Sequence, residues 1–274
     1  MIWISLGIPL SLLLIWGIWF FSKRPSHDRE WQPFSQVLPE AVISEEGFTI
    51  KNLRDFEYHQ RDEIKTEVYL ERTYRWEDLE TVWFLKEDFA EFDGFAHTFL
   101  SFGFSDGEYL TLSIEARKEV GEEYSGWSGL WRQFELMYIA GTEKDFIGRR
   151  SHHSRVPVFL YPVNIPDAGG RALLLDMLER MNRIKRYPEF YNTLTSNCTN
   201  NLYRHAERST GVKIPLSLNT LLPGYSDKTA YEMGIIPNSL PFQENRMRYR
   251  INPDRVALDD PEFSKKIREA PQSG

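Results

Sequence analysis

The sequence lacks the features that disulfide scaffolds and nucleic-acid-binding proteins need. It has one cysteine, Cys198, and a formal net charge of -7. A single thiol can form neither an intrachain disulfide nor a four-thiolate metal site. An acidic chain without a concentrated basic stripe also offers little to a phosphate backbone. A disulfide framework is therefore excluded, and we expect no nucleic-acid partner.

Metal-ligand pairs, repeats and low-complexity tracts are also lacking. No two of the six histidines have convincing ligand spacing, so we expect no metal and no other cofactor. The 274 residues suffice for one well-buried domain of roughly 230 residues plus an anchor. Aromatic residues are abundant at 14%, which suits either a β-rich core or a surface close to lipid headgroups.

The first apolar run, residues 2–21, contains no charged residue. At helical rise it spans about 30 Å, the thickness of a hydrocarbon core. A cleaved signal peptide is the alternative, but the run is long, lacks a basic leader and is followed by SKRPSHDR instead of a small-residue cleavage site. We therefore predict one transmembrane helix at residues 1–22, followed by a polar linker at 23–40.

The charges that flank this run bear on its orientation. Lys23, Arg24 and Arg29 follow it directly. The positive-inside rule, taken alone, would leave the rest of the chain in the cytoplasm.

The remainder of the chain predicts an α+β fold. Segments rich in β-branched and aromatic residues predict an antiparallel sheet or partial barrel. A long helix follows at 167–186, where apolar residues recur at helical spacing. A second helix begins near Thr195, Ser196 or Asn197 and ends before Gly211. We expect residues 216–274 to wrap the core irregularly. The predicted strands are 67–74, 81–87, 96–104, 109–117, 134–140 and 156–163.

The single thiol is placed where a thiolate is stabilised. Cys198 lies close behind a capping residue, near the unpaired amides and the positive end of the helix dipole. Both effects lower a thiol pKa. On placement alone, a small buried core residue is an equally good interpretation.

A base for this thiol is suggested by the hairpin that SDG closes at residues 105–107. A three-residue loop puts apolar residues of both strands on one face, whereas a two-residue loop mixes polar and apolar residues. The first register places His97 across from Glu115. Cys198, His97 and Glu115 then form a hypothetical nucleophile, base and orienting acid. A surface histidine and a Glu115–Arg117 pair are the alternatives.

Several motifs of this chain resemble the Lnb N-terminal periplasmic domain family of bacterial membrane proteins. The resemblance covers roughly residues 50–205. In the order of histidine strand before cysteine helix, the chain is also similar to permuted papain-like folds of the NlpC and lecithin:retinol acyltransferase type. The motifs are NLRDFEYH, YLERTY, AHTFLSFGF with the following SDGEYLTLSIEARKEVGEEYS, ELMYIAGTEKDFIGRR, VFLYP and FYNTLTSNCTNNLYRH.

This resemblance implies a periplasmic thiol acyltransferase of the bacterial inner membrane. We expect residues 41–215 to form its catalytic domain. The enzyme would move a fatty acyl chain from phospholipid to the N-terminal amine of a lipoprotein through a cysteine thioester. Cys198 and His97 match the family's motif, while Glu115 rests on the register alone. The oxyanion would be held by the Cys198 amide and a side chain from Tyr191, Asn192 or Asn197.

Two other functions stay open at this point. The same residues would serve a papain-like cysteine hydrolase, a peptidase or amidase acting on cell-envelope material, since water can replace the amine. The second open function is a noncatalytic binding domain that uses the groove between sheet and helix. Product analysis separates acyl transfer from hydrolysis, and binding without turnover would favour the noncatalytic binding domain.

Overall fold

A central sheet organises the chain. The computed structural model describes residues 2–60, 63–89, 94–215, 220 and 222–269, with side chains from Ser11 onward. Within these residues, an eight-stranded sheet has the order β1-β2-β9-β8-β7-β6-β10, and β5 also pairs with β2. A separate two-stranded sheet joins β3 and β4. The strands are β1 (Glu40–Ile43), β2 (Gly47–Arg54), β3 (Glu57–Gln60), β4 (Glu63–Thr66), β5 (Tyr69–Arg75), β6 (Leu79–Asp88), β7 (Ala96–Phe104), β8 (Tyr109–Arg117), β9 (Glu135–Gly141) and β10 (Val158–Pro162).

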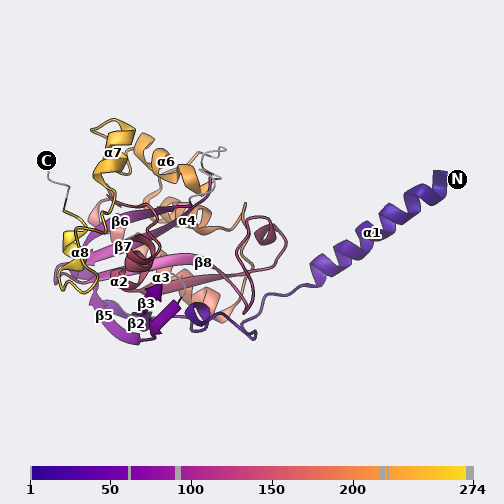
Figure 1. The fold of residues 1–274 in the computed structure, drawn as a ribbon, viewed down its shortest axis with the longest axis horizontal. Helices are drawn as coiled ribbons and strands as arrows, with labels where there is room; N and C mark the ends of the chain where they lie inside the picture. The colour runs from indigo at the N-terminus through magenta and orange to yellow at the C-terminus, as the bar shows by residue number, and fades with distance from the viewer. Residues whose placement is uncertain (1, 61–62, 90–93, 216–219, 221, 270–274) are drawn as a thin grey trace.

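Most helices lie against the sheet, whereas α1 extends away from it (Figure 1). Short 3-10 turns lie at η1, η2, η3 and η5, and η4 is a π-helical turn. The helical elements are α1 (Ile2–Ser22), η1 (Pro33–Ser35), η2 (Trp76–Asp78), η3 (Ser128–Leu130), α2 (Glu143–Gly148), η4 (Arg149–His153), α3 (Asp167–Arg186), α4 (Cys198–Thr210), η5 (Pro223–Tyr225), α6 (Ser226–Glu232), α7 (Phe242–Arg248) and α8 (Phe263–Lys266).

The predicted α+β class is confirmed, with one change to the sheet. Strands β5 to β10 and helices α3 and α4 lie where the sequence predicts them. The sheet is mixed, however, because β2 pairs with β9 in parallel at Arg54 and Gly141. Strands β1 to β4 form in the segment before residue 67, which lies outside the predicted strands.

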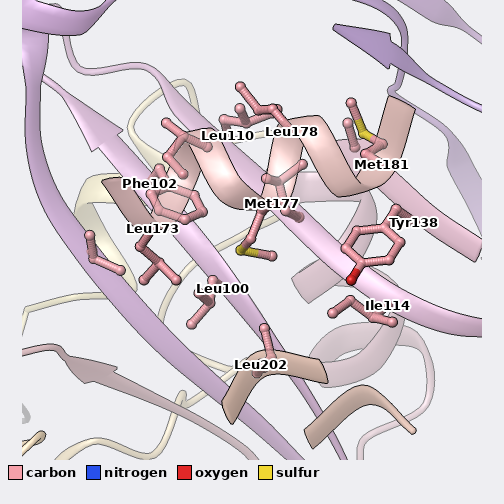
Figure 2. Close-up of a cluster of buried hydrophobic side chains, with 14 of the residues drawn as sticks. Leu100, Phe102, Leu110, Ile114, Tyr138, Leu173, Met177, Leu178, Met181 and Leu202 are labelled. Carbon is pink, nitrogen blue, oxygen red and sulfur yellow. The ribbon is translucent and has the colours of Figure 1, made fainter. Parts of the chain in front are cut away.

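The larger core lies between the sheet and helices α3 and α4. Figure 2 shows side chains of α3 pointing at one face of β7, β8 and β9, with Leu202 of α4 beside them. The apolar positions of α3 recur at helical spacing, so they form one continuous buried stripe. This packing fixes α4 against β7. The labelled residues are Leu100, Phe102, Leu110, Ile114, Tyr138, Leu173, Met177, Leu178, Met181 and Leu202.

A second core covers the opposite face of the sheet. Phe99 and Leu85 of the strands pack here with Phe146 of α2. The C-terminal segment adds Phe263 and Ile267, both buried. The sheet is therefore covered on both faces, and polar side chains of β7 that point to this side are enclosed by protein.

The β7–β8 hairpin has the predicted register. Phe99 pairs with Ser113 and Gly103 with Tyr109, and the Phe104 amide donates to the Glu108 carbonyl at 3.0 Å. Gly107 has φ +84°, the left-handed conformation that a three-residue hairpin loop requires. The alternation of the two strands therefore decides which side chains reach each face.

The predicted transmembrane helix is wrong for the described chain. Helix α1 projects away from the sheet (Figure 1). Among the described residues, no helix is both long and apolar enough to cross a membrane. Side chains of α1 are described for residues 11–22, which rise about 18 Å against the roughly 30 Å of a hydrocarbon core. Residue 1 and the side chains of 2–10 lie outside the described part.

The segment after Pro215 packs against the sheet as short helices. Ala230 and Ile236 join the larger core, and Phe263 joins the second. Residues 216–219, 221 and 270–274 of the predicted wrapping segment lie outside the described residues.

Candidate active site

Cys198 is the first residue of α4, because the residue before it caps the helix. Asn197 has extended backbone angles, and its Oδ1 accepts the Asn200 amide at 2.8 Å. The other end stops at Gly211, which has φ +73°. The thiol is buried at the N-terminus of this helix, where the first backbone amides have no intrahelical partner. Helix dipole and amides both favour a negative sulfur.

His97 lies near the start of β7, beside an acid that the hairpin register supplies. Its Nε2 is 3.0 Å from Glu115 Oε1. Ser113 joins the two, because its Oγ lies 2.8 Å from His97 Nε2 and donates to Glu115 Oε1 at 2.7 Å. The imidazole is 7% exposed, so its orientation is fixed by protein groups. The contact with Glu115 uses Nε2, and the imidazole also hydrogen-bonds with the Cys198 side chain.

The thiol and the imidazole stabilise each other's charge. Burial alone would lower the pKa of His97, but the Glu115 charge and a hydrogen bond with Cys198 raise that pKa to about 10. Burial alone would raise the pKa of Cys198, but the hydrogen bond to His97 and its charge lower it. Both shifts favour the thiolate and the imidazolium, the reactive form of a cysteine nucleophile.

Two threonines next to this pair connect β7 to α4. Thr98 Oγ1 and Thr199 Oγ1 are 2.9 Å apart, and both side chains are buried. The backbone amide and the side chain of Thr98 also contribute to the lowered pKa of Cys198. The strand that carries His97 thus also holds the sulfur. Sequence reasoning missed this role, although Thr98 is adjacent to His97 in the chain.

Glu115 is held in turn by Arg150, a residue we did not predict for the site. Arg150 Nη2 is 3.1 Å from Glu115 Oε1, and its Nε is 2.6 Å from Glu87 Oε2. Burial would raise the pKa of Glu115, but His97, Arg150 and Ser113 hold it well below its usual range. Arg150 lies in the π-helical turn η4, a distortion frequent at functional sites.

Glu87 completes this buried network from the neighbouring strand. It lies opposite His97 in the β6–β7 pairing. The register of three adjacent strands could have indicated Glu87 from the sequence. Arg150 gave only a weaker signal, because the basic stretch GRRSHHSR is also typical of a solvated loop.

The two asparagines predicted as oxyanion donors are engaged in local structure. Asn192 Oδ1 accepts the amides of Leu194 and Thr195 at 3.0 and 2.9 Å. Asn197 caps α4 and donates its Nδ2 to the Thr193 carbonyl at 2.7 Å. Both side chains therefore shape the turn that delivers Cys198.

Tyr191, the third predicted helper, interacts electrostatically with Cys198. Its hydroxyl is 3.1 Å from the hydroxyl of Tyr124. Burial and then the charge of Cys198 raise the pKa of Tyr191 well above its ordinary value. The same two causes are among those that raise the pKa of Tyr124. Both phenols remain protonated and can donate hydrogen bonds.

The part of the chain that the structure describes contains no cluster of metal ligands. No group of three or more His, Cys, Asp or Glu side chains is arranged there to hold a metal ion.

One comparison with known proteins gives a match. The family model of the Lnb N-terminal periplasmic domain matches residues 65–224, more than half of the chain. No curated protein and no solved structure matches, so the likeness to permuted papain-like folds stays a prediction. The matched segment contains Cys198, His97, Glu115 and the strands that position them. This chain belongs to the family of the Lnb N-terminal periplasmic domain.

Proposed function

We propose that this protein is a thiol acyltransferase, in which Cys198 carries a fatty acyl group from phospholipid to the N-terminal amine of a lipoprotein. Family membership makes it an Lnb-like lipoprotein-processing protein with a periplasmic domain. The observation that carries the finer proposal is the row formed by buried Cys198 at the start of α4, buried His97 on β7 and half-buried Glu115 on β8. A thiolate and an imidazolium held together in this way suit acyl transfer.

In the first half-reaction, the Cys198 thiolate attacks the carbonyl carbon of the donor ester. The C–S bond forms, the ester C–O bond breaks, and the His97 imidazolium protonates the departing alkoxide. Lysophospholipid leaves and a thioester remains. In the second half-reaction, His97 removes a proton from the amine as its nitrogen attacks the thioester. The C–N bond forms, the C–S bond breaks, and the thiolate is restored beside the imidazolium.

The negative oxygen of each tetrahedral intermediate needs donors beside the sulfur. We propose the Cys198 backbone amide, at the first turn of α4, and the hydroxyl of Tyr191 for this role. The amide side chains of Asn192 and Asn197 are used by their own turn, so they position these donors.

The proposal is tested by intact-protein mass spectrometry after incubation with phospholipid at mildly acidic pH. We expect a hydroxylamine-labile acyl adduct on the wild-type protein and none on Cys198→Ala. Because Cys198 is the single cysteine, the adduct has no other thiol to occupy. Addition of a lipopeptide with a free N-terminal amine should then give the N-acylated product.

Two outcomes would replace the proposal. Release of free fatty acid without N-acylated product would show a hydrolase. An unmodified protein with unchanged phospholipid would show that Cys198 is not an acyl carrier.

A further inference from the structure

An apolar pocket is lined by residues from four segments of the chain, two of which lead directly into Cys198 and His97. Its volume is about 270 Å³. Asn197 and Ala96 contribute to its wall, and they directly precede Cys198 and His97 in the chain. Tyr191, which interacts electrostatically with Cys198, is part of the same wall. The lining residues are Phe89, Phe95, Ala96, Tyr124, Gly126, Trp127, Leu130, Tyr191, Thr193, Leu194, Asn197, Leu222 and Pro223.

The pocket wall presents apolar surface and no ionised group to a ligand. No described residue that lines the pocket is charged. Its polar side chains bond to one another or to nearby backbone: Thr193 donates to the Gly126 carbonyl at 2.7 Å, and Asn197 donates to the Thr193 carbonyl at 2.7 Å. A peptide or sugar would leave its own polar groups unpaired here, at a cost that an aliphatic chain avoids.

The mouth of the pocket exposes large apolar side chains. Trp127 is 68% exposed, Leu194 48% and Phe95 37%. Trp127 is supported from behind by Trp131, with ring centroids 5.2 Å apart. Clustered apolar groups at a rim mark the entry of an apolar ligand.

We infer that this pocket binds the aliphatic chain of the acyl group, with the carbonyl carbon of that group at Cys198. The inference rests on the proposed function and names the part of the substrate that the domain recognises. Gly126 and Phe95 both line the pocket, and a Cβ added at Gly126 would come 3.1 Å from Phe95 Cζ. A side chain at residue 126 would therefore close the pocket.

Chain binding can be measured without catalysis by titrating the full chain carrying Cys198→Ala with dibromostearate, whose bromine atoms quench tryptophan fluorescence on contact. We expect saturable quenching that is largely lost when Trp127→Phe is added. Gly126→Leu should weaken binding at least tenfold, about 1.4 kcal/mol. Val120→Phe adds bulk to the same loop outside the pocket wall and should leave affinity unchanged.

Leu194→Glu is the second variant, because residue 194 is exposed at the mouth and its substitution disturbs no core. It puts a charge at the entry and should also weaken binding tenfold, so it decides the question if Gly126→Leu does not fold. Equal affinity in Leu194→Glu and Val120→Phe, or quenching that does not saturate, would overturn the inference.

A parallel measurement separates this inference from the proposed function. The short donor p-nitrophenyl acetate reports acylation of Cys198 without needing the pocket. An acetyl-enzyme without dibromostearate binding would refute the pocket and leave thiol acylation intact. Dibromostearate binding without any acetyl- or acyl-enzyme would refute the proposed function and keep the pocket.

Discussion

The protein contains two buried histidines that contact an acid, and only one of them is set up for chemistry. His97 lies 3.0 Å from Glu115, and His205, in the same helix as Cys198, lies 2.5 Å from Asp176. The pKa of His97 is raised to about 10. Burial lowers the pKa of His205, and the opposing effect of Asp176 does not overcome it.

The two histidines differ in the partner of their second ring nitrogen and in the charges near their acid. His97 interacts with two acidic groups, Glu115 and the Cys198 thiol, and both raise its pKa. His205 meets one anion and the neutral hydroxyl of Tyr138, 2.7 Å from its Nε2. The charges of Arg208 and Arg180 further lower the pKa of His205. In this protein, the buried histidine whose pKa is raised is the one that interacts with a second acidic group, Cys198, in addition to its carboxylate.

The largest effect should separate the two histidines directly. His97→Gln removes the general acid and base and should slow acylation of Cys198 by about 10²–10⁴-fold. His205→Gln, its matched control, should leave that rate within threefold and cost about 1–3 kcal/mol of stability through lost buried hydrogen bonds. Single-turnover acylation and urea denaturation measure the two effects. Equal rate losses in both variants would refute the contrast.

The next effect concerns Arg150, which positions Glu115 and acts on His97 only through it. Arg150→Met should cost about 3–5 kcal/mol, because Glu87 and Glu115 lose a buried counter-charge. Adding Glu87→Gln should recover much of the stability but not the acylation rate. The acid limb of the pH–rate profile should move to higher pH, since Arg150 no longer lowers the pKa of Glu115. An unmoved limb would make Arg150 merely structural.

A smaller effect is the pH dependence of the thiol itself. Iodoacetamide should alkylate wild-type Cys198 well below its ordinary pKa of 9.0, because that pKa is lowered. In His97→Gln, burial is no longer opposed by the imidazolium, so alkylation at pH 7 should fall. Acyl transfer by the wild type should decline again above about pH 10, where the imidazolium deprotonates. His205→Gln should reproduce the wild-type profile.

The same raised pKa has a consequence for stability. Protonation of His97 stabilises the fold fully below its ordinary pKa of 6.5, and this contribution is lost as pH rises through about 10. The lowered pKa of His205 gives the opposite sign, since its neutral form is the folded one.

The smallest effect compares the two ends of α4. Asn197→Ala removes the cap at the thiol end and should cost about 1 kcal/mol. It should also raise the pKa of Cys198, because the first turn loosens. Gly211→Ala strains the left-handed residue at the other end and should cost about 1 kcal/mol without changing the thiol pKa. Urea denaturation and thiol titration distinguish them.

Much of this architecture could be predicted because alternation and spacing were clear. The apolar face shared by β7 and β8 fixed one register, and the stripe of α3 fixed its bounds. Strands β1 to β4 were missed because their segment carries many charges and little alternation of polar and apolar residues. These strands form because neighbouring strands pair with them, not because of a strong local preference.

The residues of the candidate site also fall into two groups, those that local sequence patterns could place and those that they could not. Residues that follow from one strand pair or one helix start could be placed, as with Glu115 and Cys198. Arg150 and Asn192 could not, because their roles depend on which groups surround them after folding. The transmembrane prediction used residues 1–22 as one apolar string, and the described part of that string is too short to support it.

The hairpin register has a consequence for sequence variation. The turn at Ser105–Gly107 is separated from His97 by most of a strand, about 27 Å at strand rise. One residue inserted in that turn would move the Glu115 side chain to the opposite face of the sheet, away from His97. An ionised thiol therefore requires the right length of this distant turn as much as it requires the histidine. We expect homologous chains to keep this turn length and to vary in the length of the β8–β9 loop.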